Sequence, residues 1–148
     1  MRIEQATPED VDAISVVLGE IEAYYGGKPT PGDTDQIRSA LFSGRPAATV
    51  LLARDGDDVW GLASYSLLWP AAGAETSLYL KELYVRESAR RRGVAGALME
   101  AVKAAAAEAG CSRVEWTADT DNPSALAFYA ALGVEPRNGK IFYRAEGS

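Results

Sequence analysis

The sequence predicts an α/β fold in which helices flank a mixed, mostly antiparallel central sheet. Apolar residues recur at helical spacing early in the chain, form β-rich runs through its middle, and return to helical spacing after the third run. Three successive strand runs, two of them joined by a hairpin turn signal, favour antiparallel pairing in the first half of the sheet. The expected order is β-α-α-β-β-β-α-β-α-β, in one domain that spans residues 1–148.

The first half of the chain carries start and stop signals for its elements. Thr7 is a typical N-cap, Pro8 suits the first helical position, and Gly26 ends the helix. The sequence DGDD, residues 55–58, is a hairpin turn signal between two β-rich runs. The elements expected here are a strand over 2–6, a helix over 7–25, a helix over 34–42 capped from Asp33 or Thr34, and strands over 47–54, 59–69 and 77–85.

The second half alternates helices with strands. Val94, Leu98 and Val102 lie on one face of a long helix, which is the apolar stripe of a helix packed on a sheet. The elements expected here are a helix over 94–109 that Gly110 ends, a strand over 112–118, a helix over 123–132 that Asn122 caps, and a final strand over 139–145.

The composition excludes several classes of site. The chain has 148 residues, a formal net charge of −6 and no histidine, so Ser-His-Asp triads, Cys-His pairs and histidine metal sites are excluded. Cys111 is the single cysteine, which excludes an internal disulfide and a cysteine metal cluster, and no metal is expected. The acidic balance argues against nucleic-acid binding and fits either a cationic small molecule or good solubility. No signal-peptide core or membrane-length apolar run is present, so we expect a cytoplasmic protein without membrane contact.

The densest positive charge lies where a strand run passes into the long helix. Arg90, Arg91 and Arg92 directly precede Gly93. The first backbone N–H groups of a helix have no intrahelical partner and carry partial positive charge, so this turn suits an anion such as a pyrophosphate. Gly93 would let the backbone approach a bulky anion, and arginine would add charge-assisted bonds. A solvated arginine run beside an ordinary helix start is the competing interpretation.

Two segments resemble the GNAT superfamily of N-acetyltransferases. Arg90-x-x-Gly93-x-Ala95 is similar to the acyl-CoA pyrophosphate motif of that family, and it likewise follows a strand and precedes a long helix. NPSALAFYAALG, residues 122–133, is similar to the family segment N-x-x-A-x-x-F-Y-x-x-x-G. Within the superfamily, residues 61–85 look most like the diamine (spermidine/spermine) N-acetyltransferase branch, although Lys81 stands where that branch commonly has an acidic residue.

The resemblance implies acetyl-CoA as the co-substrate and names the groups that bind it. Main-chain groups of Leu83 and Val85 would bind the pantetheine arm, beside a sheet that splays there, and backbone amides of residues 91–96 would bind the pyrophosphate. Asn122 is a further contact of the family on the CoA arm, and it is equally a plain helix cap. The residues assigned to the donor in this way are Leu83, Tyr84, Val85, Arg90, Arg91, Arg92, Gly93, Val94, Ala95, Gly96, Asn122, Ala125 and Phe128.

The expected catalytic side chains are Tyr129 and Glu82. The leaving thiolate needs a proton, and the resemblance places the phenol of Tyr129 at the sulfur as general acid; an apolar helical stripe is the alternative. Glu82 is the candidate for proton removal from the amine and for ammonium binding, and a surface or edge-strand glutamate is the alternative. A backbone N–H near Val85 is the expected oxyanion donor. Regular alternation would place Leu80, Glu82 and Tyr84 on one face of their strand.

The sequence therefore predicts direct transfer of an acetyl group from acetyl-CoA to a primary amine of a small, cationic acceptor. Tyr24, Tyr25 and Trp69 lie in segments that wall the acceptor site in relatives, and with Glu82 they are the expected substrate contacts; plain packing is the alternative. Two other functions stay open, namely a protein or peptide N-acetyltransferase and a non-catalytic acyl-CoA-binding module. A homodimer is common among relatives and is expected on that resemblance.

Overall fold

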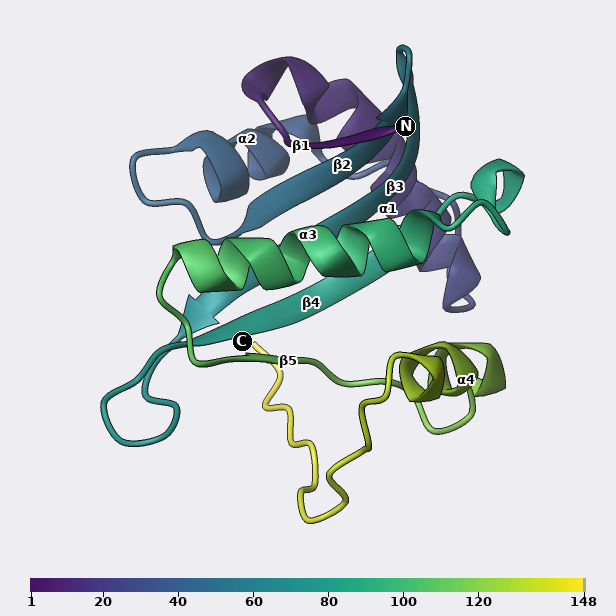
Figure 1. The fold of residues 1–148 in the computed structure, drawn as a ribbon. Helices are drawn as coiled ribbons and strands as arrows, with labels where there is room; N and C mark the ends of the chain where they lie inside the picture. Colours follow the sequence, from purple (N-terminus) through teal and green to yellow (C-terminus); the bar gives the residue numbers. More distant parts are fainter. Residues whose placement is uncertain (148) are drawn as a thin grey trace. The chain divides into compact units, whose positions relative to one another are not determined.

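A five-stranded sheet with the order β1-β2-β3-β4-β5 forms the centre of the first compact unit, Met1–Trp116 (Figure 1). The computed structural model describes residues 1–147. The first three strand pairs are antiparallel and β4 pairs with β5 in parallel, so the prediction of a mixed, mostly antiparallel sheet is confirmed. The strands are β1 (Arg2–Gln5), β2 (Thr49–Asp55), β3 (Asp58–Leu68), β4 (Ser77–Val85) and β5 (Arg113–Glu115).

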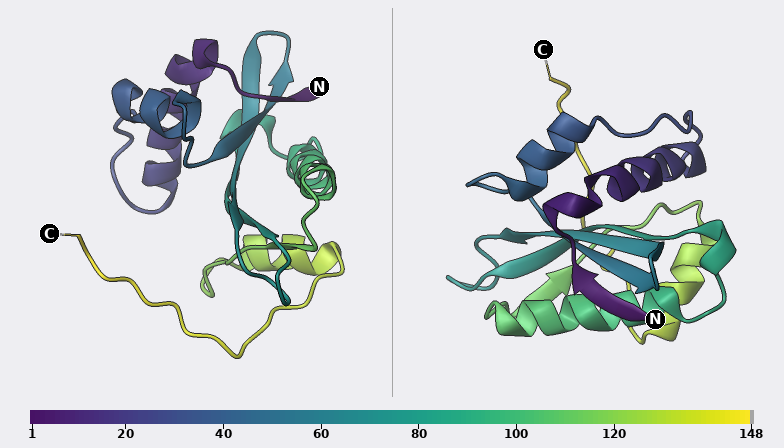
Figure 2. Two further views of the ribbon diagram at one scale, coloured as in Figure 1. Left: turned by 90° about the vertical axis from the view of Figure 1, so that its left-hand side faces the viewer. Right: turned by 90° about the horizontal axis from the view of Figure 1, so that it is seen from above.

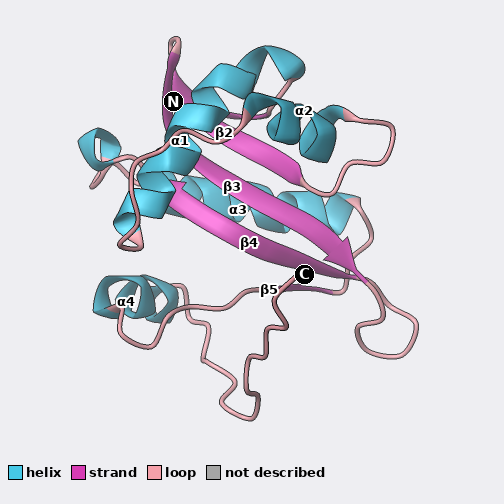
Figure 3. Ribbon diagram, turned by 180° about the vertical axis from the view of Figure 1, so that it is seen from behind, coloured by secondary structure: helices cyan, strands magenta, loops and turns pink. Residues whose placement is uncertain are grey.

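Helices cover both faces of this sheet. Helices α1 and α2 lie on one face and α3 lies on the other (Figure 2), and the view from behind shows α1 and α2 in front of the strands (Figure 3). Within residues 1–147, none of the helices is long and apolar enough to cross a membrane. The helices of this unit are η1 (Pro8–Asp10), α1 (Val11–Tyr24), α2 (Thr34–Phe42), η2 (Glu87–Ala89) and α3 (Val94–Glu108), of which η1 and η2 are single 3-10 turns.

Local side-chain chemistry sets the ends of several elements. The first predicted helix begins with η1, in which Pro8 holds the first position, and continues as α1. Asp33 caps α2, because its carboxylate accepts the N–H of Gln36 at 2.9 Å. Gly56 has φ 59°, so the two residues between β2 and β3 make the tight hairpin that the DGDD sequence predicts.

Each face of the sheet has its own apolar layer. Both layers are made of aliphatic side chains, which each stabilise the fold by about 1.5–3 kcal/mol when fully buried. The layer under α1 and α2 contains Val11, Ile14, Val17, Ile37, Val50, Leu52 and Leu62. The buried residues of α3 are Val94, Leu98, Met99, Val102 and Ala106. The helical stripe that the sequence predicts for this helix is therefore its packed face.

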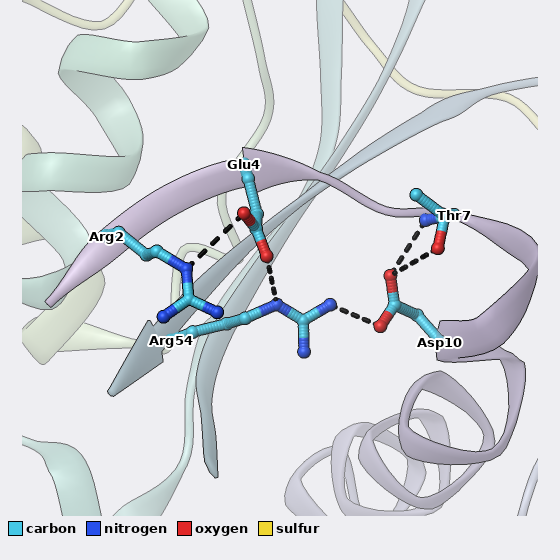
Figure 4. Close-up of polar contacts among 5 residues, drawn as sticks. All are labelled: Arg2, Glu4, Thr7, Asp10 and Arg54. Carbon is cyan, nitrogen blue, oxygen red and sulfur yellow. Dashed lines mark hydrogen bonds and ion pairs between the residues drawn. The ribbon is translucent and has the colours of Figure 1, made fainter. Parts of the chain in front are cut away.

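A charged network joins β1 and η1 to β2 (Figure 4). The Arg54 guanidinium donates to the Asp10 carboxylate, and its Nε lies 2.7 Å from Glu4 Oε1. Asp10 also accepts the backbone N–H of Thr7 at 2.8 Å. Only 12% of the Arg54 side chain and 13% of the Asp10 side chain are exposed, so solvent screens this pair weakly. The network fixes the entry of the chain into α1.

An irregularity in β4 corrects the expected alternation. The pairing of β4 with β3 shifts by one residue between Leu80 and Glu82, which leaves Lys81 as an extra residue. An extra residue moves the side chains beyond it to the other face of the strand. Leu80 therefore lies on the face opposite to Glu82 and Tyr84, and the expectation that all three share one face was wrong.

The second compact unit begins at Thr117 and contains one helix, α4 (Pro123–Ala131). The final strand expected over residues 139–145 does not form, and residues 134–147 have no helix or strand. Ile141, Phe142 and Tyr143 are β-forming residues, but a strand needs a partner edge, and residues 134–147 pair with no strand in the described structure. These three side chains are 77%, 69% and 84% exposed.

Candidate active site

We name residues 86–93, which join β4 to α3, the anion loop. Arg91 has φ 65° and Gly93 has φ 74°, so the loop passes twice through the left-handed conformation. That conformation is inexpensive for glycine and costs an L-residue about 1–2 kcal/mol. The first bond of α3 runs from the Ala97 N–H to the Gly93 carbonyl at 3.1 Å, so the N–H groups of residues 94–96 have no acceptor within the helix. A helix end of this kind suits an anion.

Two arginines of the loop lie against aromatic rings. The Arg90 guanidinium carbon lies 5.7 Å from the centre of the Tyr24 ring and 5.9 Å from that of Tyr84, and Arg90 Nε donates to the Val85 carbonyl at 3.2 Å. The Arg92 guanidinium carbon lies 5.0 Å from the centre of the indole of Trp60. These are cation–π distances. Arg90 therefore braces the loop against β4 and α1.

Glycines leave open space at the start of α3 and allow close packing between α3 and the sheet. A Cβ built on Gly93 or on Gly96 would meet no heavy atom within 4 Å. A Cβ on Gly61, by contrast, would lie 2.9 Å from the Tyr84 carbonyl and 3.1 Å from the side chains of Val94 and Leu98. Gly61 thus lets α3 pack closely on β3. Sequence reasoning missed this glycine because nothing in its local pattern marks a contact with a distant helix.

The two edges of β4 differ in their described pairing. On its β3 side, β4 stays paired up to Val85, which lies opposite Gly61. On its other side, the described pairing with β5 covers Ser77–Tyr79, and β4 continues beyond it to Val85, where the anion loop begins. Backbone N–H and C=O groups along a strand edge can pair with an extended ligand.

A carboxylate on α1 organises the end of β4. Glu20 accepts two hydrogen bonds from the Arg86 guanidinium, at 3.1 Å from Nε and at 2.7 Å from Nη2. The Tyr84 hydroxyl lies 3.5 Å from the same carboxylate. Burial raises the pKa of the Tyr84 phenol, and the charge of Glu20 raises it further, so Tyr84 stays neutral at neutral pH. Sequence reasoning missed Glu20 and Arg86, because they lie 66 residues apart and share no motif.

The structure brings some of the predicted acceptor residues together. The rings of Tyr24 and Tyr25 meet edge to face at 5.2 Å, and Tyr24 meets Tyr84 at 6.2 Å. Tyr24 and Tyr25 are exposed at the end of α1. Glu82 is half-buried, on the face of β4 that also carries Tyr84. These side chains lie near the end of β4 where the anion loop begins.

Trp69 lies elsewhere. It directly follows β3, at the end of the hairpin where Leu68 pairs with Ser77, and β4 runs from there toward the anion loop. The indole N–H donates to the Ala74 carbonyl at 2.8 Å, which closes its own loop. The side chain is 68% exposed. The structure therefore does not group Trp69 with Tyr24 and Tyr25.

The second unit holds the other predicted residues on α4. Asn122 Oδ1 accepts the N–H of Ala125 at 3.1 Å, so the predicted cap is present. The rings of Phe128 and Tyr129 lie 5.4 Å apart, and both side chains are half-buried. Ala125, Phe128 and Tyr129 of the second motif thus lie on one short helix.

Comparison with known proteins gives a consistent set of relatives. The model of the Acetyltransferase (GNAT) family matches residues 17–134. Aminoglycoside N(6′)-acetyltransferase type 1 of Serratia marcescens is 32% identical over 113 residues, which cover 74% of this chain and 76% of that enzyme. L-ornithine N5-acetyltransferase of Arabidopsis thaliana is 33% identical over 67 residues, which cover 45% of this chain and 29% of that enzyme. An integron cassette protein of V. cholerae has a TM-score of 0.85 and 30% identity, over 99% of this chain and 92% of that chain.

The family match agrees with the geometry. It covers the anion loop, the bulged strand β4 and α4, which are the segments that carry the two sequence motifs. The mixed α/β sheet is also the fold of the solved neighbours. The chain belongs to the Acetyltransferase (GNAT) family.

Proposed function

We propose that the protein transfers an acetyl group directly from acetyl-CoA to a primary amine of a small, cationic acceptor. The observation that carries this proposal is the anion loop, which joins the end of β4 to the N-terminus of α3. A helix N-terminus suits a pyrophosphate, and the edge of a strand suits an extended pantetheine arm. The acetyltransferase family of the chain supports the same donor.

The donor is proposed to lie along β4 and across the start of α3. Main-chain groups of Leu83 and Val85 would pair with the pantetheine arm, because they lie on β4 beyond its described pairing with β5 and next to the anion loop. The N–H groups of residues 94–96 would bind the pyrophosphate, and the open sides of Gly93 and Gly96 leave room for it. Arg91 and Arg92, which are exposed, would add charge-assisted bonds.

Residues of α4 are proposed to complete the grip on CoA. The side-chain oxygen of Asn122 serves the helix cap, so its contact with the CoA arm would come from the amide NH₂ group. Ala125 and Phe128 lie further along the same helix and are proposed as apolar neighbours of the arm.

The acceptor amine must lose a proton before it can attack. An alkyl amine with a pKa of about 10.4 is neutral in about one molecule in 2,500 at pH 7, which costs roughly 4–5 kcal/mol. Glu82 is proposed to bind the ammonium and to take its proton, directly or through water. Its place on the face of β4 that also carries Tyr84, whose ring meets that of Tyr24, supports this role.

Tyr129 is proposed to protonate the departing thiolate. A phenol has an ordinary pKa of about 10, so it carries its proton at neutral pH and can act as a general acid. The backbone N–H near Val85 is proposed to donate to the carbonyl oxygen of the acetyl group as negative charge develops there. No covalent enzyme intermediate is needed in this scheme.

The acceptor is proposed to be a small amine with more than one positive charge. The match to an aminoglycoside acetyltransferase and to an ornithine acetyltransferase supports this class. The resemblance to the diamine branch would narrow it to polyamines. Tyr24 and Tyr25 are proposed to contact the cationic part of the acceptor through their rings. A cytoplasmic homodimer is part of the same proposal, and light scattering in solution tests the dimer.

One experiment tests the scheme and separates the alternatives. CoA release would be measured with acetyl-CoA and a panel of polyamines, amino acids, aminoglycosides and peptides, for wild type and Tyr129→Phe. We expect turnover on small amines that falls strongly in Tyr129→Phe and persists in the matched control Tyr143→Phe, whose ring is 84% exposed. Turnover on peptides alone would favour a protein acetyltransferase. CoA binding without turnover on any amine would favour a non-catalytic module.

A further inference from the structure

Arg86 connects three elements at the point where β4 passes into the anion loop. Its backbone N–H donates to the Trp60 carbonyl at 2.9 Å, and its own carbonyl accepts the Ala89 N–H at 2.9 Å, which closes η2. Its guanidinium donates to both carboxylate oxygens of Glu20. A bidentate pair of this kind fixes orientation as well as distance. Arg86 is the first residue of the anion loop, and it therefore ties the start of the loop to α1 and β3.

The same face of α1 also contacts the loop on the other side of η2. Glu20 and Tyr24 are one helical turn apart, and side chains at that spacing share a face. Glu20 binds Arg86, which precedes η2, and Tyr24 lies against Arg90, which follows it. Neither Glu20 nor Arg86 belongs to the sequence motifs, and the proposed chemistry uses neither.

We propose that Glu20 is a positioning residue, which holds the anion loop in its donor-binding conformation through Arg86. The inference rests on the proposed function, since it names a side chain that supports acetyl-CoA binding without touching acetyl-CoA. The loop needs such support for two reasons. Arg91 and Gly93 are exposed, and the left-handed backbone at Arg91 is unfavourable unless its neighbours hold it.

The exposure of the pair sets the size of the expected effect. The side chains of Arg86 and Glu20 are 35% and 29% exposed, so solvent screens their interaction. We expect loss of the carboxylate to weaken CoA binding about fivefold, which is the upper end of the range for exposed pairs. The KM for acetyl-CoA should rise by a similar factor. The kcat should change little, because Glu20 does not touch the reacting atoms.

The test is a double-mutant cycle read out as the Kd for CoA in titration calorimetry. Glu20→Gln and Arg86→Gln should each weaken binding about fivefold, and the double variant should be no weaker than either single variant. The matched control is Glu100→Gln, which removes a carboxylate 3.4 Å from Lys103 on the surface of α3 and should leave the Kd unchanged. Thermal unfolding confirms that each variant is folded. Arg86→Lys keeps the positive charge but loses the bidentate guanidinium, so its Kd for CoA should lie between those of wild type and Arg86→Gln.

The outcomes separate this inference from the proposed function. Wild-type Kd in Glu20→Gln, or additive effects in the double variant, would overturn the positioning role while leaving the donor assignment in place. A drop in kcat with an unchanged KM would also overturn it, because a loop that binds the donor acts on KM. Absence of CoA binding by the wild-type protein would overturn both proposals together.

Discussion

Gly96 offers a prediction in which stability and donor binding change in opposite directions. It is the third residue of α3, with an ordinary helical backbone, and a Cβ built on it meets no heavy atom within 4 Å. Glycine within a helix is less favourable than alanine by up to about 1 kcal/mol. Gly96→Ala should therefore raise the free energy of unfolding by about 0.5–1 kcal/mol, and raise Tm by about 1–4 °C for a chain of this size.

The same methyl group should weaken donor binding. It would occupy open space in the first turn of α3, whose N–H groups we propose bind the pyrophosphate. Loss of one hydrogen bond to a charged group costs about 1.5–3 kcal/mol, so the Kd for CoA should rise at least about tenfold. Thermal unfolding and titration calorimetry on the same preparation measure both effects.

A second glycine serves as the control. Gly44, in the loop between α2 and β2, also has no heavy atom within 4 Å of an added Cβ. Gly44→Ala should leave the Kd for CoA unchanged. If Gly96→Ala bound CoA as wild type does, the open side of Gly96 would not be the donor site. A fall in Tm would refute the helix argument.

Three further predictions follow from the charged groups. Burial favours protonation of Asp10, but the hydrogen bonds from Thr7 and Arg54 outweigh it and hold its pKa below the ordinary 3.8, so the ionised form stabilises the fold. Asp10→Asn should cost about 1–3 kcal/mol at pH 7, and the deficit in urea unfolding should shrink as the pH falls from 3.8 through the lower folded pKa; a deficit of constant size would contradict this. Glu82→Gln should lower acceptor turnover far more near neutral pH than at high pH, where the amine is already neutral, and a pH-independent loss would leave Glu82 only a binding or structural role. Arg91→Ala should raise the KM for acetyl-CoA by a factor that diminishes with added salt, and a factor insensitive to salt would count against a phosphate contact.

Much of the fold could be predicted because its signals are local. Caps, turn residues and periodicity lie within a few positions of the elements that they set, as with Asp33 at the start of α2 and Gly56 in the hairpin. The turn at Gly93 was also predictable, since a glycine directly before a helical stripe marks it locally. Gly93 has a left-handed φ and open space beside it, and both properties explain why glycine suits this position.

The features that the sequence did not predict depend on residues far apart in the chain. The bulge at Lys81 arises from the pairing of β4 with β3, and it reverses the alternation that a single strand suggests. The Glu20–Arg86 pair joins α1 to β4, and no local pattern announces it. The segment around Phe142 has β-forming residues, but a strand needs a partner edge, and residues 134–147 pair with no strand in the described structure.

Mass-spectrometric detection of the acetylated amine, with CoA release measured in the same reaction, tests the central claim most directly. The reaction would contain the wild-type protein, acetyl-CoA and one of a polyamine, ornithine, an aminoglycoside or a peptide. The proposed function predicts one N-acetylated small amine for each CoA released, and strongly reduced product with Tyr129→Phe. CoA bound by the protein, with no acetylated product from any amine, would contradict it.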